Sequence, residues 1–162
     1  MGRLAERLNN IRVRVRMPGT EIEAELSARN NITMSFGESV YQFVSERFLE
    51  GALASLARLL FTGWLREYRA AIADTELNID PNDQHDLNFR DARKEIESTG
   101  ESSDGRVWLS AVGMNDFTAR ITRGTVRELR EREFVARVRE AAAALIEDYR
   151  AQVRELKKRH YG

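Results

Sequence analysis

The C-terminal segment of the chain carries a dense group of cations that could bind a phosphate or another anion. Five basic residues lie there with Glu155 as the one acidic neighbour: Arg150, Arg154, Lys157, Lys158 and Arg159. Basic side chains at a helix end can contact phosphate groups without reading a base sequence. They also complement the negative end of the helix dipole, which is the purely structural alternative. Arg3 and Arg7, near the N-terminus, could add to the same basic surface.

A second group of cations alternates along residues 11–17. Arg12, Arg14 and Arg16 would share one face of a strand there, because successive side chains of a strand point to opposite faces. A row of arginines on one face could grip phosphates. The next segment decides against that use, because it carries three glutamates at the same spacing: Glu21, Glu23 and Glu25.

The register of this predicted hairpin follows from its turn. If the turn centres on Pro18-Gly19, then Arg14 lies opposite Glu23. The flanking pairs would be Arg16 with Glu21 and Arg12 with Glu25. Ion pairs across neighbouring strands neutralise the arginines and help to fix the register. We therefore expect this face to be a solvated structural surface and not a phosphate site.

A wide apolar helix face lies between residues 53 and 65. Its arc is wider than one three-stranded sheet needs, which predicts an interface with the other half of the chain or with a second chain. The residues assigned to this interface are Leu56, Leu60, Phe61 and Trp64. Because the aromatic rings share their face with leucines, packing is favoured over stacking on nucleic-acid bases. Strand alternation does not assign a face to Trp108.

The residues that most enzymes use for catalysis are scarce. The chain has no cysteine and two histidines, His85 and His160. This excludes disulfides, thiolate metal sites and cysteine nucleophiles. No glycine-rich phosphate loop or serine nucleophile motif is present, and the residues from Asp80 to Asp86 lack the glycine and final glutamate of a Ca²⁺ loop. We predict a protein that is not an enzyme and that uses no cofactor or metal.

Charge and hydropathy narrow the classes of partner. The 162 residues include 26 basic and 26 acidic ones, so the formal net charge is zero. This excludes binding to a polyanion by bulk charge, but it leaves a local basic surface open. The N-terminal residues lack the apolar core of a signal peptide. The stretch 53–65 is too short, and too interrupted by Arg58 and Gly63, to cross a bilayer. We expect a cytoplasmic protein without a membrane partner.

The first half of the chain has a clear order of predicted elements. A short helix over residues 3–8 precedes a β-hairpin, whose strands cover 11–17 and 21–26. A third strand covers 32–36 after a turn-rich segment. Apolar residues at three- and four-residue steps then predict a long helix from Phe43 to Ile72.

The second half repeats this order. A helix over residues 81–96 comes first, with a proline at its first position. A hairpin turn at Asp104-Gly105 leads into a strand over 106–112, and a third strand covers 117–121. The last helical pattern extends from Phe134 to Leu156.

Further matches between the halves indicate an internal duplication. Each long helix is preceded by a possible capping box, Ser39-x-x-Gln42 in the first half and Thr125-x-x-Glu128 in the second. Each helix also contains the triplet Tyr-Arg-Ala, at residues 68–70 and 149–151. The alternative is a chance likeness between two α+β halves.

Together these elements predict an α+β fold. Each half would be an α-β-β-β-α unit, and the two would form an intramolecular pseudo-dimer with antiparallel sheets covered by long helices. The expected boundaries are residues 1–73 for the first half, 74–92 for an acidic linker with the start of a helix, and 93–162 for the second half.

Two segments carry a resemblance to a known family. The stronger is Glu101-Ser-Ser-Asp-Gly-Arg-Val-Trp-Leu-Ser-Ala-Val112, followed by Asp116-Phe-Thr-Ala-Arg-Ile121 and an alanine-rich helix. The weaker is Met17-Pro-Gly-Thr-Glu-Ile-Glu-Ala-Glu-Leu26. With its order of elements, the chain resembles the YbaB/EbfC nucleoid-associated proteins, as a tandem-duplicated member of the actinobacterial type. It departs from them in its two copies, its short first helix and its zero net charge.

The resemblance implies a small cytoplasmic protein of the nucleoid, typically a homodimer, whose helices project from a central sheet like tweezers. It implies DNA binding through backbone contacts, with little sequence preference. The alternative is a protein-interaction module, such as an accessory protein of an actinobacterial type VII secretion locus. The helix-end cations favour DNA as the partner, whereas the zero net charge favours a protein.

Overall fold

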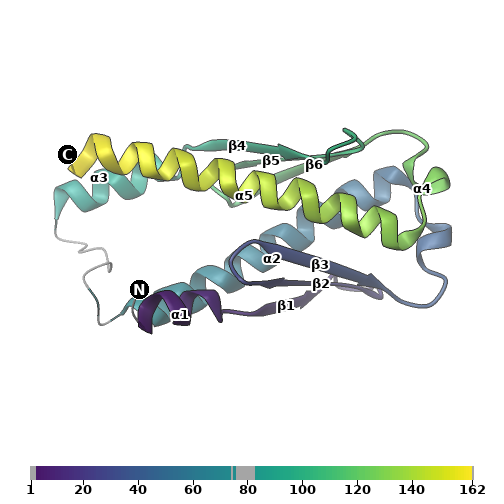
Figure 1. The fold of residues 1–162 in the computed structure, drawn as a ribbon, viewed down its shortest axis with the longest axis horizontal. Helices are drawn as coiled ribbons and strands as arrows, with labels where there is room; N and C mark the ends of the chain where they lie inside the picture. Colours follow the sequence, from purple (N-terminus) through teal and green to yellow (C-terminus); the bar gives the residue numbers. More distant parts are fainter. Residues whose placement is uncertain (1–2, 74, 76–82, 162) are drawn as a thin grey trace.

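The computed structural model describes residues 3–73, 75 and 83–161 (Figure 1). The first half contains helix α1 (Arg3–Asn9), strands β1 (Val13–Arg16), β2 (Ile22–Ser27) and β3 (Asn31–Phe36), the 3₁₀ turn η1 (Tyr41–Phe43) and helix α2 (Glu46–Ile72). The second half contains helix α3 (Gln84–Arg93), strands β4 (Glu97–Glu101), β5 (Val107–Val112) and β6 (Asp116–Ile121), and helices α4 (Thr125–Glu128) and α5 (Glu131–Tyr161). The predicted α+β fold of two similar halves is confirmed.

Each half folds its strands into one antiparallel sheet. The strand orders are β1-β2-β3 and β4-β5-β6. The alternation seen in the sequence decides which face is buried, since Ile22, Ala24 and Leu26 of β2 all point into the core. In β5 the alternate residues Val107 and Leu109 do the same.

The predicted register of the first hairpin is wrong by two residues. Arg14 lies opposite Glu25 and not Glu23, while Arg16 lies opposite Glu23. A shift of two residues leaves every side chain on its original face. The arginines therefore still meet glutamates, with Arg12 and Arg14 at 3.5 and 3.7 Å from Glu25 and Arg16 at 3.9 Å from Glu23.

The longer hairpin loop explains the shift. Thr20 N–H donates to the Met17 carbonyl at 3.2 Å, which closes a turn through Pro18 and Gly19. Pairing then resumes where Met17 N–H donates to the Ile22 carbonyl at 3.0 Å. The loop between the strands is thus four residues long, and the register prediction had allowed only two.

Both predicted capping boxes are misplaced, for a shared reason. A short helical turn, η1 in the first half and α4 in the second, stands between the third strand and the long helix. Helix α2 is capped by Ser45, whose Oγ accepts from Phe48 N–H at 3.1 Å. Ser39 instead has a left-handed backbone with φ of 65°. Thr125 is the first residue of α4, and it does not cap the long helix.

The two long helices join the halves. Helix α2 packs on β1 and β2 of its own sheet and on β6 of the other, whereas α5 packs on β4, β5 and β3. Figure 1 shows both helices crossing the molecule between the two sheets. Their buried leucines and aromatic residues, such as Leu56 of α2 and Phe134 of α5, belong to one core. The halves therefore share a core, as expected of the predicted pseudo-dimer.

Polar contacts from the first half also reach the second half. Glu50 Oε2 accepts from Ile121 N–H at 2.8 Å, and Glu46 Oε2 accepts from Val126 N–H at 2.9 Å. Two carboxylates of α2 thus bind backbone donors of β6 and α4, which leaves those donors satisfied.

Strand β4 packs very closely against α5. A Cβ atom at Gly100 would lie 2.3 Å from both the Ala141 carbonyl oxygen and the Leu145 nitrogen. Only glycine fits that space. Ser98, two residues earlier, is buried on the same face. The strand is therefore built from small and polar residues, which carry no apolar pattern in the sequence.

The predicted helix over 81–96 is shorter in the structure. Asp83 caps α3, with its Oδ1 accepting from His85 N–H at 2.8 Å. The predicted proline start at residue 81, and the linker residues Asp74, Glu76 and Asp80, lie outside the described residues.

Helix α2 is long and apolar enough, by length and composition alone, to cross a membrane. Its leucines at positions 49, 53, 56 and 60 are buried in the core that the two halves share. This pattern is typical of a core helix.

Candidate nucleic-acid interface

Two helical arms extend from the same end of the molecule (Figure 1). The α3–α5 arm consists of α3 and residues 147–161 of α5, and the α1–α2 arm consists of α1 and residues 61–72 of α2. In the α3–α5 arm, Phe89 and Leu156 form a small second core. Tyr161 donates a hydrogen bond to Asp86, which raises the pKa of Tyr161 to about 12. This packing fixes the last turns of α5 in place.

Four of the predicted phosphate-binding cations lie exposed on this arm. They are Arg154, Lys157, Lys158 and Arg159. Within the part of the chain that is described, the one ion pair in this group joins Lys158 to Glu155 at 3.7 Å, and both partners are exposed. An exposed pair of this kind is worth little. The group therefore keeps most of its charge available for an anion.

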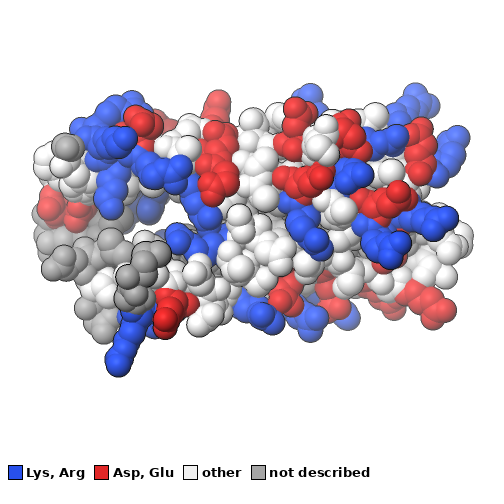
Figure 2. All heavy atoms as spheres, viewed as in Figure 1, with Lys and Arg blue, Asp and Glu red and all other residues white. Residues whose placement is uncertain are grey.

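Arg3 and Arg7 lie on the other arm. Both are exposed on α1, which packs against α2. The sequence predicted that they add to the patch at the end of α5, but the structure places them on the opposite arm. Figure 2 shows an open gap between the two arms, with Lys and Arg side chains beside it. Cations thus stand on both arms.

Arg150 lies apart from the four exposed cations. It is half-buried at the base of the gap, where α5 passes the turn between β2 and β3. Its Nη2 donates to the Arg29 carbonyl at 2.7 Å, and its Nη1 lies 3.7 Å from Glu147. Burial lowers the pKa of Arg150, and the nearby charges of Arg29 and Arg154 lower it further. Arg150 therefore links the two halves and is not a member of a solvated tail.

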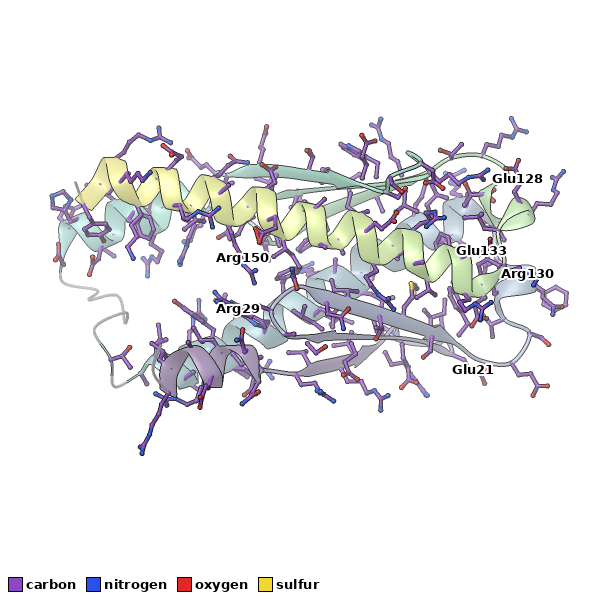
Figure 3. The ribbon with its side chains drawn as sticks, viewed as in Figure 1. Glu21, Arg29, Glu128, Arg130, Glu133 and Arg150 are labelled. Carbon is purple, nitrogen blue, oxygen red and sulfur yellow. The ribbon has the colours of Figure 1, made fainter. Side chains whose placement is uncertain are left out.

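Arg29 is a residue of the site that the sequence did not reveal. It is half-buried in the β2–β3 turn, and Figure 3 shows that its side chain points toward Arg150. The two residues are 121 positions apart. The sequence marks residues 29–31 only as a turn, and nothing in their spacing connects them with the last helix.

Aromatic side chains belong to both arms. Trp64 and Tyr68 of α2 stack with ring centroids 5.0 Å apart. On α5, burial raises the pKa of the Tyr149 hydroxyl, with Arg93 acting against this and Tyr68 adding to it. Each arm thus contributes at least one tyrosine, Tyr68 from α2 and Tyr149 from α5.

Three of the four predicted interface residues pack against the other half of the same chain, whereas Trp64 stacks on Tyr68 of its own helix. Leu56 and Leu60 are 2% and 1% exposed in the shared core. Phe61 stacks on Phe117 of β6 at a centroid distance of 5.4 Å. The two partners predicted for this face were the other half of the chain and a second chain. In the structure, the other half of the chain covers it.

The structure also assigns a face to Trp108. Its neighbours Val107 and Leu109 are buried, so Trp108 lies on the opposite, outer face of β5. There the Arg120 guanidinium lies 5.3 Å from the centre of its ring. A cation already stacks on this indole, which makes it part of the structural surface.

The chemistry available to the arms is the binding of anions. Among the described residues, no group of three histidine, aspartate or glutamate side chains is arranged to hold a metal ion. Lys and Arg side chains lie beside the gap (Figure 2), and their ammonium and guanidinium groups donate hydrogen bonds to phosphate oxygens.

Comparison of the chain with protein-family models, with curated proteins and with solved structures finds no match. The resemblance to YbaB/EbfC proteins stays a prediction from the two quoted segments and the order of elements. The geometry of the arms is the physical basis for a function.

Proposed function

We propose that this protein binds DNA through its phosphate backbone, without catalysis and with little sequence preference. The observation that carries the proposal is the set of exposed cations at the end of α5, of which only Lys158 forms an ion pair with a described residue, and which lies across a gap from Arg3 and Arg7 (Figure 1). Cations of this kind bind phosphates irrespective of base sequence. The expected location is the cytoplasm, at the nucleoid.

The zero net charge is compatible with this proposal because the charges are unevenly distributed. On the first hairpin, arginines pair with glutamates, so that surface presents little net charge. Along residues 154–159 of α5, four cations have one acidic sequence neighbour, Glu155, while Asp86 of α3 is hydrogen-bonded to Tyr161 beyond them. The local field, and not the total charge, decides where a polyanion binds.

The four-alanine variant at Arg154, Lys157, Lys158 and Arg159 tests this function. The slope of log K against log salt should flatten by up to about 0.9 for each phosphate group that the variant no longer neutralises, and by the same amount for duplexes of different sequence. The measurement is a fluorescence-anisotropy titration of labelled duplex DNA at several salt concentrations.

The matched control removes three cations from the ion-paired face of the first hairpin, as Arg12→Ala, Arg14→Ala and Arg16→Ala together. It should leave the salt slope of the wild type nearly unchanged. If the four-alanine variant keeps the wild-type slope, the end of α5 is only a solvated helix end and the proposed interface is wrong.

A second candidate, a protein-interaction module such as a secretion-locus accessory protein, has one observation in its favour. At the end of the first sheet, a shallow groove of about 520 Å³ is lined by Val40, Val44 and Phe48. The neighbouring Phe43 is 83% exposed. Under this alternative, Phe43→Ser would abolish partner binding, while the four-alanine variant would leave it intact.

A further inference from the structure

Two arginine side chains from different halves lie together at the base of the gap between the arms (Figure 3). The Arg150 guanidinium is fixed there, because its Nη2 donates to the backbone carbonyl of Arg29 at 2.7 Å. The Arg29 side chain, in contrast, makes no hydrogen bond or ion pair with any described residue, and its buried Nε–H has no acceptor. A half-buried guanidinium without an acceptor has unused capacity to bind an oxyanion.

The charges around this pair are unbalanced. Arg29 and Arg154 both lie close enough to affect Arg150, and across the described residues the nearest opposing group is the Glu147 carboxylate, at 3.7 Å from Arg150 Nη1. Glu147 itself is 56% exposed, so its charge is screened by water. Like charges held together away from water are unfavourable. An anion bound between them would relieve this repulsion.

The backbone at this point is also strained. Ala28 and Arg29 have φ of 48° and 72°, in the left-handed region that residues with a Cβ atom avoid. The turn between β5 and β6 has the same pair of left-handed residues, Gly113 and Met114, so this conformation belongs to the hairpin, and what is particular to the first turn is the arginine that it carries. Here the 2.7 Å bond from Arg150 to the Arg29 carbonyl supports the turn.

We propose that Arg29 and Arg150 form a binding site for one phosphate group at the base of the gap. The guanidinium of Arg29 can rotate toward the ligand without losing a hydrogen bond, and a guanidinium can hold two oxygens of one phosphate. Arg150 and Arg154 supply the remaining positive charge. The identification of this phosphate as part of a DNA backbone rests on the proposed function. Free inorganic phosphate would offer the same oxygen atoms to the two arginines.

The variant Arg29→Asn tests the site. Asparagine tolerates the left-handed region, so the turn should be kept while the cation is removed. We expect affinity for a labelled duplex to fall about ten-fold and the salt slope to flatten by about 0.9, as for the removal of one cation that neutralises a phosphate. The control Arg14→Gln, which removes an exposed cation of the first hairpin, should change the affinity less than two-fold.

A second experiment uses inorganic phosphate as the only ligand. Phosphate at millimolar concentrations should raise the melting temperature of the wild type and of Arg14→Gln, but not that of Arg29→Asn, because a ligand that binds only the folded state stabilises it. If Arg29→Asn does not fold, Arg29→Lys replaces it. Lysine keeps the charge but loses the planar fork, so weaker binding with little change in slope is then expected.

The outcomes separate this site from the proposed function. Phosphate stabilisation that requires Arg29, in a protein that does not bind DNA, supports the site and overturns the function. DNA binding with wild-type affinity and slope in Arg29→Asn, or in Arg29→Lys if that variant must be used, overturns the site and leaves the function standing. Phosphate stabilisation that is equal in wild type and variant also overturns the site.

Discussion

The turns between the second and third strands of the two halves have similar backbones and very different side chains. In the first half, Ala28 and Arg29 have φ of 48° and 72°; in the second half, Gly113 and Met114 have φ of 62° and 51°. Two consecutive left-handed residues are thus built once with a glycine and once without. The arginine of the first turn is therefore not required by the shape of the turn.

The surroundings of the two turns explain their residues. Gly113 N–H donates to the Ile96 carbonyl at 2.8 Å, and a Cβ atom there would lie 2.4 Å from the Lys94 carbonyl oxygen, so the second turn is packed tightly against its own half. The first turn instead meets the other half through the Arg150–Arg29 bond. The comparison shows that one turn serves packing within a half, while the other joins the halves and places a cation beside the gap.

The largest effect on stability is expected when the glycine of the second turn is replaced by alanine and the alanine of the first turn by glycine. Gly113→Ala should cost about 2 to 4 kcal/mol in the free energy of unfolding, because its Cβ meets backbone and its left-handed φ becomes strained. Ala28→Gly should change the same quantity by less than about 1 kcal/mol, because relief of strain offsets the added freedom of the unfolded chain.

Urea unfolding followed by circular dichroism measures both changes. The corresponding control within one half is Gly105→Ala, where the backbone is also left-handed but nothing lies within 4 Å of the added Cβ. Equal losses for Gly113→Ala and Gly105→Ala would mean that close packing does not distinguish the second turn.

A smaller effect is expected when the link between the halves is removed. Arg150→Gln takes away the 2.7 Å bond to the Arg29 carbonyl and should lower the free energy of unfolding by about 1 to 2 kcal/mol. Urea unfolding again provides the measurement, with the exposed neighbour Arg154→Gln as the control, for which a change below about 0.5 kcal/mol is expected. A change equally small for Arg150→Gln would show that this bond does not hold the first turn.

Much of the fold could be predicted because local patterns determine it. Alternation in β2 and β5 and the steps of apolar residues in α2 and α5 arise from burial on one face, which the sequence displays directly. The register of the first hairpin could not be fixed in the same way, because any shift of two residues preserves the faces. Strand β4 has no apolar pattern, since it is buried by the close approach of α5 at Gly100.

The candidate site was predictable only in part. The cations at the end of α5 are on consecutive turns of one helix, so the sequence displays them together. Arg29 meets Arg150 because α5 crosses the sheet of the other half, and this contact depends on how the two halves pack. The spacing of apolar residues in one sequence shows which face of a helix or strand is buried. It does not show which other helix or strand that face contacts.

The most direct measurement is an NMR titration of the arginine Nε–Hε signals of the wild-type protein with duplex DNA. The difference between the two turns predicts that the largest shift belongs to Arg29, whose Nε–H has no acceptor among the described residues, with further shifts at Arg154 and Arg159. The signals of Arg12, Arg14 and Arg16, which face glutamates, should stay nearly unmoved. Shifts concentrated on that hairpin, or a saturating titration that leaves the Arg29 signal in place, would contradict a phosphate site at the base of the gap.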